Sequence, residues 1–109
     1  MSATISGDTI SLTRGDSLIL TVSLEKDGEA YIPQDGDKIR FAMKKDISDK
    51  DCLILKDIDM NTMRLQIDPE DTKNLSFGSY IYDIELTTSD GFVDTFIGPA
   101  TFKITKEVY

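Results

Sequence analysis

The side chains that could perform chemistry here are mostly carboxylates, because the 109 residues include 20 Asp and Glu and no His. Without histidine the chain lacks the commonest general base, the usual Ser and Cys nucleophile pairs and most zinc sites. The single cysteine, Cys52, stands next to Asp51, whose negative charge disfavours a thiolate. We therefore interpret Cys52 as a small, partly buried apolar residue. We predict no enzymatic activity, no catalytic residues and no cofactor.

Two acidic clusters could in principle bind calcium. Asp46, Asp49 and Asp51 lie close together, and Asp35 and Asp37 flank a glycine. Neither cluster has the ligand spacing of an EF-hand loop, which ends with a glutamate at position twelve. We interpret both as turn-forming aspartates on a solvated surface, and we predict no metal site.

Two other motifs have both a functional and a structural interpretation. Arg14-Gly15-Asp16 matches the three-residue integrin-binding motif, but Gly-Asp is also typical of a tight turn, which is the interpretation we favour. Tyr80 and Tyr82 could stack on a sugar ring or a base. Their alternation with Asp83 and Glu85 instead favours packing in the core.

Charge and composition narrow the possible partners and compartment. The net charge is −8 and the isoelectric point is about 4.3, so the chain should repel nucleic-acid backbones and anionic membranes. The first residues show neither a basic region nor a long apolar run, so we predict no signal peptide. With one cysteine and no membrane-spanning stretch, the chain is expected to fold in a reducing cytoplasm.

The elements that must position these residues show the two-residue alternation of strands with one buried face. The apolar members of the clearest runs are Leu18, Leu20, Val22 and Leu24; Ile39, Phe41 and Met43; Met63, Leu65 and Ile67; and Tyr80, Tyr82, Ile84 and Leu86. Ile10 and Leu12 indicate a short first strand. Within the first run, Ile19 is the one apolar residue that should face outward.

Two segments leave their side-chain direction open. Leu53, Ile54 and Leu55 are all apolar, so the buried face cannot be identified. A strand over 92–97 continues into 101–105 across Gly98-Pro99, with or without a one-residue bulge. With the bulge, Val93 and Ile97 share a face with Phe102; without it, Phe92 and Phe96 do.

One short helical turn is expected near residues 69–75. Asp68-Pro69-Glu70-Asp71 combines a capping residue, a proline at the first helical position and acids in the first turn. We predict that this turn crosses from one sheet to another, with Leu75 and Phe77 plugging the end of the core. Ser89-Asp90-Gly91 is typical of a hairpin turn.

The region 68–86 resembles one corner of immunoglobulin-like sandwiches. There, an acidic-threonine pair precedes a strand whose tyrosine hydroxyl bonds back to the corner, and here Asp71-Thr72 precedes Tyr80. Tyr82 stands where antibody domains have a cysteine, and the chain has no tryptophan. We predict a single all-β domain over 1–109, an immunoglobulin-like antiparallel β-sandwich of about seven to nine strands.

Four short motifs carry a second resemblance. They are Leu12-Thr13-Arg14-Gly15-Asp16-Ser17, Gly36-Asp37-Lys38-Ile39-Arg40-Phe41, Pro69-Glu70-Asp71-Thr72 and Gly78-Ser79-Tyr80-Ile81-Tyr82-Asp83-Ile84. In this order they are similar to small proteins encoded among the structural genes of phages and prophages of Gram-positive bacteria. They also resemble the N-terminal immunoglobulin-like domain of phage baseplate upper proteins.

The resemblance implies a non-enzymatic virion part, of the tail or baseplate, that packs against copies of itself or other phage structural proteins. It implies a homo-oligomer within an assembly, found in the bacterial cytoplasm before assembly and in the virion afterwards. It carries no catalytic residues to transfer. The alternative that the sequence leaves open is a β-sandwich module that binds carbohydrate or a host surface protein.

Overall fold

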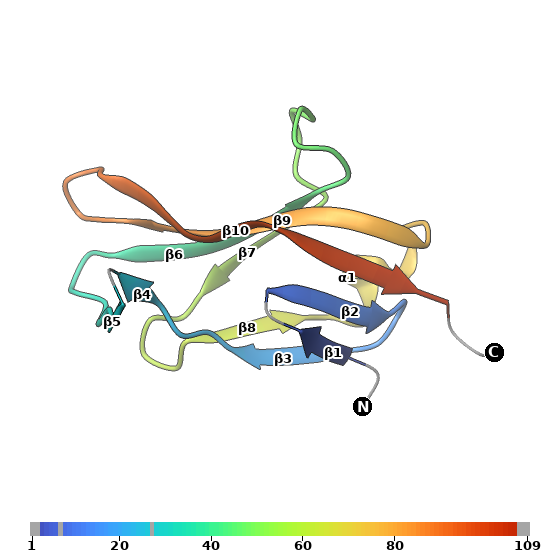
Figure 1. Cartoon of the computed structure of the whole chain (residues 1–109), viewed down its shortest axis with the longest axis horizontal. Helices are drawn as coiled ribbons and strands as arrows, with labels where there is room; N and C mark the ends of the chain where they lie inside the picture. The colour runs from blue at the N-terminus through green and yellow to red at the C-terminus, as the bar shows by residue number, and fades with distance from the viewer. Residues whose placement is uncertain (1–2, 7, 27, 107–109) are drawn as a thin grey trace.

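Ten strands, arranged in one six-stranded and two two-stranded sheets, and one short helix make up the computed structural model, which describes residues 3–6, 8–26 and 28–106 (Figure 1). The strands are β1 (Ala3–Ser6), β2 (Thr9–Thr13), β3 (Leu18–Thr21), β4 (Glu25–Lys26), β5 (Glu29–Ala30), β6 (Lys38–Lys44), β7 (Ile54–Ile58), β8 (Arg64–Ile67), β9 (Gly78–Thr87) and β10 (Val93–Thr105). The helix α1 (Pro69–Lys73) lies between β8 and β9. The all-β prediction is confirmed.

One layer is a six-stranded sheet, here called the main sheet, in the order β1-β2-β10-β9-β6-β7. The other layer is the pair β3-β8, which lies across the interior from the main sheet in Figure 1. Every pairing within the main sheet is antiparallel except that of β2 with β10, which is parallel. The predicted antiparallel arrangement is therefore wrong for this one pair, because alternation of apolar residues shows which side is buried but not in which direction a strand runs.

The alternating side chains of β6 and β9 point into one core as predicted, and Tyr80 and Tyr82 are each 3% exposed. The buried apolar residues are Ile10, Leu12, Leu18, Val22, Leu24, Ile39, Phe41, Met43, Ile54, Ile58, Leu65, Ile67, Tyr80, Tyr82, Ile84, Leu86, Phe102 and Ile104. Val22 and Leu24 are buried although β3 ends at Thr21. Ile19 faces outward, as its position in the alternation predicts.

Residues on β10 change register twice along β9. Thr95 pairs with Glu85, Ile97 with Ile84 and Ala100 with Tyr82, so two shifts occur where the sequence suggested one or none. Neither predicted alternative holds: Phe96 and Ile97 both pack against the core, while Phe92 and Val93 are exposed. Gly98 is needed here, because its φ is +104° and a Cβ would lie 2.7 Å from the Tyr82 carbonyl oxygen.

The corner at α1 is held by contacts between segments far apart in the sequence. As predicted, α1 carries the chain from β8 in one layer to β9 in the other. The hydroxyl of buried Thr72 accepts a hydrogen bond of 2.8 Å from the Gly15 N–H. Leu75 packs against the core, but Phe77 is 43% exposed, so the prediction that both close the end of the core holds only for Leu75. The ring of Phe77 instead lies under the Arg14 guanidinium, whose carbon is 4.2 Å from the ring centroid.

Candidate interaction surface

Two carboxylates of the loop at 45–53 form hydrogen bonds within the loop itself. The Asp46 carboxylate accepts hydrogen bonds from the backbone N–H and the hydroxyl of Ser48, and Asp49 accepts one from the Asp46 N–H. The prediction that these are turn-forming aspartates is confirmed for Asp46 and Asp49. Among the described residues, no group of three or more His, Cys, Asp or Glu side chains is arranged to hold a metal ion.

Asp37 has a structural role at the other end of the molecule, whereas Asp35 is exposed. The Asp37 carboxylate is 8% exposed and accepts hydrogen bonds of 2.8 Å from the Tyr31 hydroxyl and from the Gln34 N–H. The hydrogen bond to Asp37 raises the pKa of Tyr31, and burial and the Asp37 charge act in the same direction. This carboxylate therefore closes a turn and is not free to bind a ligand.

The Arg14-Gly15-Asp16 motif forms the turn between β2 and β3, as predicted, with the Asp16 N–H bonded to the Thr13 carbonyl at 3.1 Å. The Arg14 guanidinium donates to the Leu75 carbonyl at 3.2 Å. The turn is thus attached to the corner around α1. An integrin-binding loop would instead have to project from the surface.

Tyr80 and Tyr82 belong to the core, as their alternation predicted. The Tyr80 hydroxyl donates to the Ser76 carbonyl at 2.7 Å, and the Tyr82 hydroxyl donates to the Asp8 carbonyl. Burial, with a smaller contribution from the Asp8 charge, raises the pKa of Tyr82 to about 12. Neither ring is available to stack on a ligand.

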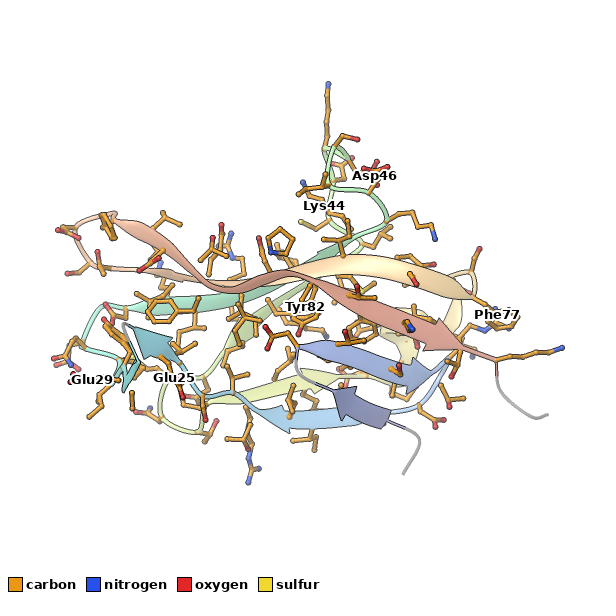
Figure 2. All side chains as sticks on the ribbon, viewed as in Figure 1. Glu25, Glu29, Lys44, Asp46, Phe77 and Tyr82 are labelled. Atoms are coloured by element: carbon orange, nitrogen blue, oxygen red, sulfur yellow. The ribbon has the colours of Figure 1, made fainter. Side chains whose placement is uncertain are left out.

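Cys52 is exposed, so the prediction that it is partly buried is wrong. It lies at the end of the loop that follows β6 and rises above the main sheet (Figure 2). Free cysteine behaves as a small apolar side chain and is often buried, but here the loop returns to the sheet only after this residue.

The outer side of the main sheet carries an apolar surface, which we call the outer patch, and the loop contributes Ile47 to it. The patch consists of Ala42, Ile47, Leu55, Ile81 and Pro99. Leu55 pairs with Ala42 across β7 and β6. All patch residues except Leu55 line one hollow of about 90 Å³. Ile47 is 63% exposed and Leu55 is 54% exposed. Scattered apolar side chains are normal on a protein surface, whereas a large contiguous apolar group is typical of an interaction site.

Two charged residues, Lys44 and Asp83, also line the hollow of the outer patch. Burial raises the pKa of the Asp83 carboxyl, and the nearby positive charge of Lys44 partly offsets this effect. The Lys44 ammonium donates to the Asp49 carbonyl at 2.6 Å, which connects the loop to β6. A hollow of this size accommodates one side chain of a partner.

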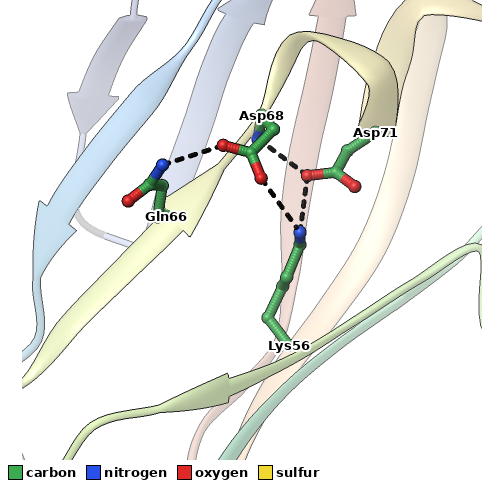
Figure 3. Close-up of polar contacts among 4 residues, drawn as sticks. All are labelled: Lys56, Gln66, Asp68 and Asp71. Atoms are coloured by element: carbon green, nitrogen blue, oxygen red, sulfur yellow. Dashed lines mark hydrogen bonds and ion pairs between the residues drawn. The ribbon is translucent and has the colours of Figure 1, made fainter.

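The strand β7 forms one edge of the main sheet beside the outer patch. Its interior-facing Lys56 places the ammonium nitrogen 2.9 Å from an Asp71 oxygen and 3.6 Å from an Asp68 oxygen (Figure 3). The hydrogen bond to Asp71 is the main cause that raises the pKa of Lys56, although burial partly opposes it. This ion pair connects the edge of the main sheet to the cap of α1.

A second surface lies at the β9–β10 hairpin. An open depression there is lined by residues that include Gln34, Asp35, Asp90 and Phe92. The Phe92 ring is 61% exposed, and the Asp90 carboxylate bonds to the Thr88 hydroxyl. This hydrogen bond, followed by one from the Phe92 backbone, lowers the pKa of Asp90. The depression combines one exposed ring with several polar groups.

Sequence reasoning missed the outer patch. The signal was the run Leu53-Ile54-Leu55, which is apolar on both sides of a strand; the structure buries Ile54 and exposes its two neighbours. Ile47 stands alone in a polar loop, so no periodic pattern marks it.

No family model, curated protein or solved structure matches this chain. In the part of the chain that the structure describes, no helix has the length and apolar character needed to cross a bilayer.

Proposed function

We propose that this chain is an immunoglobulin-like β-sandwich that serves as a non-enzymatic structural component of a phage or prophage virion, in the tail or baseplate. It acts by packing against other protein chains, either copies of itself or neighbouring phage proteins. Under this proposal it is present in the bacterial cytoplasm before assembly and in the particle afterwards, and it binds neither nucleic acid nor membrane. The four ordered motifs from Leu12 to Ile84 supply the phage context.

Two features support the immunoglobulin-like architecture. The chain crosses between two facing layers, and the Tyr80 hydroxyl near the start of β9 bonds to the Ser76 carbonyl just upstream. A tyrosine bonded back to its own corner is a recurring feature of that fold. The parallel pairing of β2 and β10 and the second layer of only two strands distinguish this chain from antibody domains.

The observation that carries the function is the outer patch. Ile47 lines a hollow the size of one side chain, and Leu55 lies beside Ala42 of the same hollow; both side chains are more than half exposed. Exposed aliphatic groups of this kind cost free energy in water and are covered when two proteins associate.

The test is mass spectrometry of purified particles from an induced lysogen that carries this gene. We expect peptides of this chain at a constant ratio to the other virion proteins across a density gradient. Ile47→Asp and Leu55→Asp should reduce incorporation, whereas Ile32→Asp, a matched change at a 74% exposed isoleucine outside the patch, should not. Purified virions that lack the chain would refute the proposal.

The depression around Phe92 supports a second candidate, a module that binds carbohydrate on a host surface. An exposed ring beside carboxylates and an amide can stack on a sugar and accept its hydroxyl hydrogen bonds. A glycan array, screened with and without calcium, tests it. Consistent binding to one sugar class that Phe92→Ala abolishes would favour this second function over the first.

A further inference from the structure

Among the described residues, β7 is the last strand of the main sheet and pairs with β6 alone; β8 meets the chain just beyond the end of β7, through a bridge between Asp59 and Arg64. Alternate residues of an antiparallel strand direct their backbone N–H and C=O groups to opposite sides, so half of these groups in β7 point away from β6. Such a row can pair with a further strand.

The features that normally block an edge strand are weak in β7. Ile54–Ile58 contains no proline, and its pairing with β6 is continuous. A lysine that faces inward usually opposes pairing, because the added strand would bury its charge. The Lys56 ammonium, however, already lies within ion-pair distance of Asp71 and Asp68, so an added strand would not bury it alone.

The outward side chains of this edge are apolar at one end and acidic at the other. Leu53 and Leu55 are 46% and 54% exposed, and Asp57 follows on the same side of the sheet. A strand added beside β7 would place every second side chain next to one of these three residues. The layer formed by β3 and β8 has fewer exposed aliphatic residues for an added strand to contact. In β3 only Ile19 is an exposed aliphatic residue, and the outward residues of β8 are Arg64 and Gln66.

Charge favours a partner other than a second copy. The segment 46–59 holds five aspartates and two lysines, and one of these lysines is already paired with α1. Two copies joined through β7 would bring two such acidic segments together, in chains that each carry a net charge of −8. Like charges at an interface suppress association, and complementary charges promote it.

We propose that β7 binds an extended segment of a different protein by strand addition. The segment presents two aliphatic residues and one lysine or arginine at alternate positions, so that they lie beside Leu53, Leu55 and Asp57. This inference rests on the proposed function as a packing protein and names the chemistry of its partner. Strand addition supplies affinity through the backbone, and the alternate side chains supply specificity.

The test uses the full chain and fluorescent peptides with the alternating pattern Leu-Thr-Leu-Thr-Arg or its reverse, because the strand can add in either direction. Matched peptides carry Glu in place of Arg. We expect fluorescence anisotropy to show that one Arg peptide binds at least about fivefold more tightly than its Glu counterpart. Asp57→Lys should reverse this preference. The control Asp35→Lys, the same change at an exposed aspartate near the hairpin, should leave it unchanged.

Amide hydrogen exchange then locates the bound peptide, with protection expected in β7 and not in β3. Failure of both Arg peptides to bind, an unchanged preference in Asp57→Lys, or protection elsewhere would overturn the inference. So would a concentration-dependent dimer in sedimentation that Leu55→Lys abolishes, because a second copy would then occupy the edge. A chain present in virions that binds no peptide would remove this inference alone; peptide binding by a chain absent from virions would remove the proposed function alone.

Discussion

The β9–β10 ribbon consists of two arms, separated by the register shifts between Thr95 and Ala100, and their surroundings differ. In the first arm, Ala100–Thr105, the stretch 102–104 pairs with both β9 and β2, and Phe102 and Ile104 are fully buried. In the second arm, Val93–Ile97 has β9 as its one strand partner within the described residues, and Val93 is 52% exposed. We call these the closed arm and the open arm. The same strand is thus fully buried at alternate positions where β2 also pairs with it, and exposed or only partly buried where β9 is its one partner.

The largest expected difference between the arms comes from matched Phe→Ala substitutions. Phe102 is 0% exposed, and its ring centroid lies 6.2 Å from those of Phe41 and Tyr82. Phe102→Ala should therefore lower the free energy of unfolding by about 3–5 kcal/mol. Phe96→Ala in the open arm should cost about 1–2 kcal/mol, because that ring is only partly buried, against Tyr31. Urea unfolding followed by circular dichroism measures both, and equal losses would contradict the comparison.

Tyr82 lies on β9 opposite Ala100 of the closed arm. Its hydroxyl should make the stability of the fold depend on pH in the alkaline range. Its pKa in the folded chain is about 12, above the ordinary value of 10.0, so the folded state binds this proton more tightly than the unfolded state. The resulting stability is fully present below pH 10 and is lost as the pH rises towards 12, by up to about 3 kcal/mol. Tyr82→Phe should flatten the fall in unfolding free energy over this range, as measured by urea titrations at several pH values. If the unfolding free energy of the variant still falls over this pH range, groups other than Tyr82 cause the fall.

A matched Thr→Val pair tests the polar contacts at the ends of the two arms. Thr72→Val leaves the Gly15 N–H without its partner in a buried corner, which should cost about 1–3 kcal/mol. Thr88, beside the open arm, bonds locally to Asp90 and Phe92 at the surface, so Thr88→Val should change stability by less than about 0.5 kcal/mol. Thermal unfolding of both variants measures the difference. A larger loss in Thr88→Val would show that the hairpin is also a stabilising element.

The smallest change in the free energy of unfolding is expected at the tip of the open arm. Phe92 is 61% exposed, so Phe92→Ser should change the unfolding free energy by less than about 0.5 kcal/mol. The same denaturant titration checks this value. A marked loss would mean that the ring packs in solution, which would also weaken the carbohydrate-binding alternative.

The sequence predicted well wherever burial depends on alternation within one strand. The inward residues of β6 and β9 and the outward position of Ile19 follow from a two-residue period that each strand shows independently. The helical turn was equally predictable, because Asp68 and Pro69 specify where a helix begins. These features depend on neighbours along the chain.

The candidate surface was not predictable in the same way. Nothing in Leu53-Ile54-Leu55 indicates which side meets the core, and Ile47 belongs to the outer patch only because its loop rises above β9 and β10. The predicted partial burial of Cys52 was wrong for a related reason, because residue type does not show where a loop leaves the sheet.

By itself, the sequence determined the strand content, the identity of most core side chains and the lack of histidine chemistry, because each is a property of residue type or of spacing along a few residues. Only the tertiary structure decided that β2 runs parallel to β10, that Thr72 meets Gly15 across 57 positions, and that β7 forms an edge beside exposed leucines. The physical reason is that these features depend on which distant segments share an interface. That choice is made by the packing of the whole chain rather than by any local pattern.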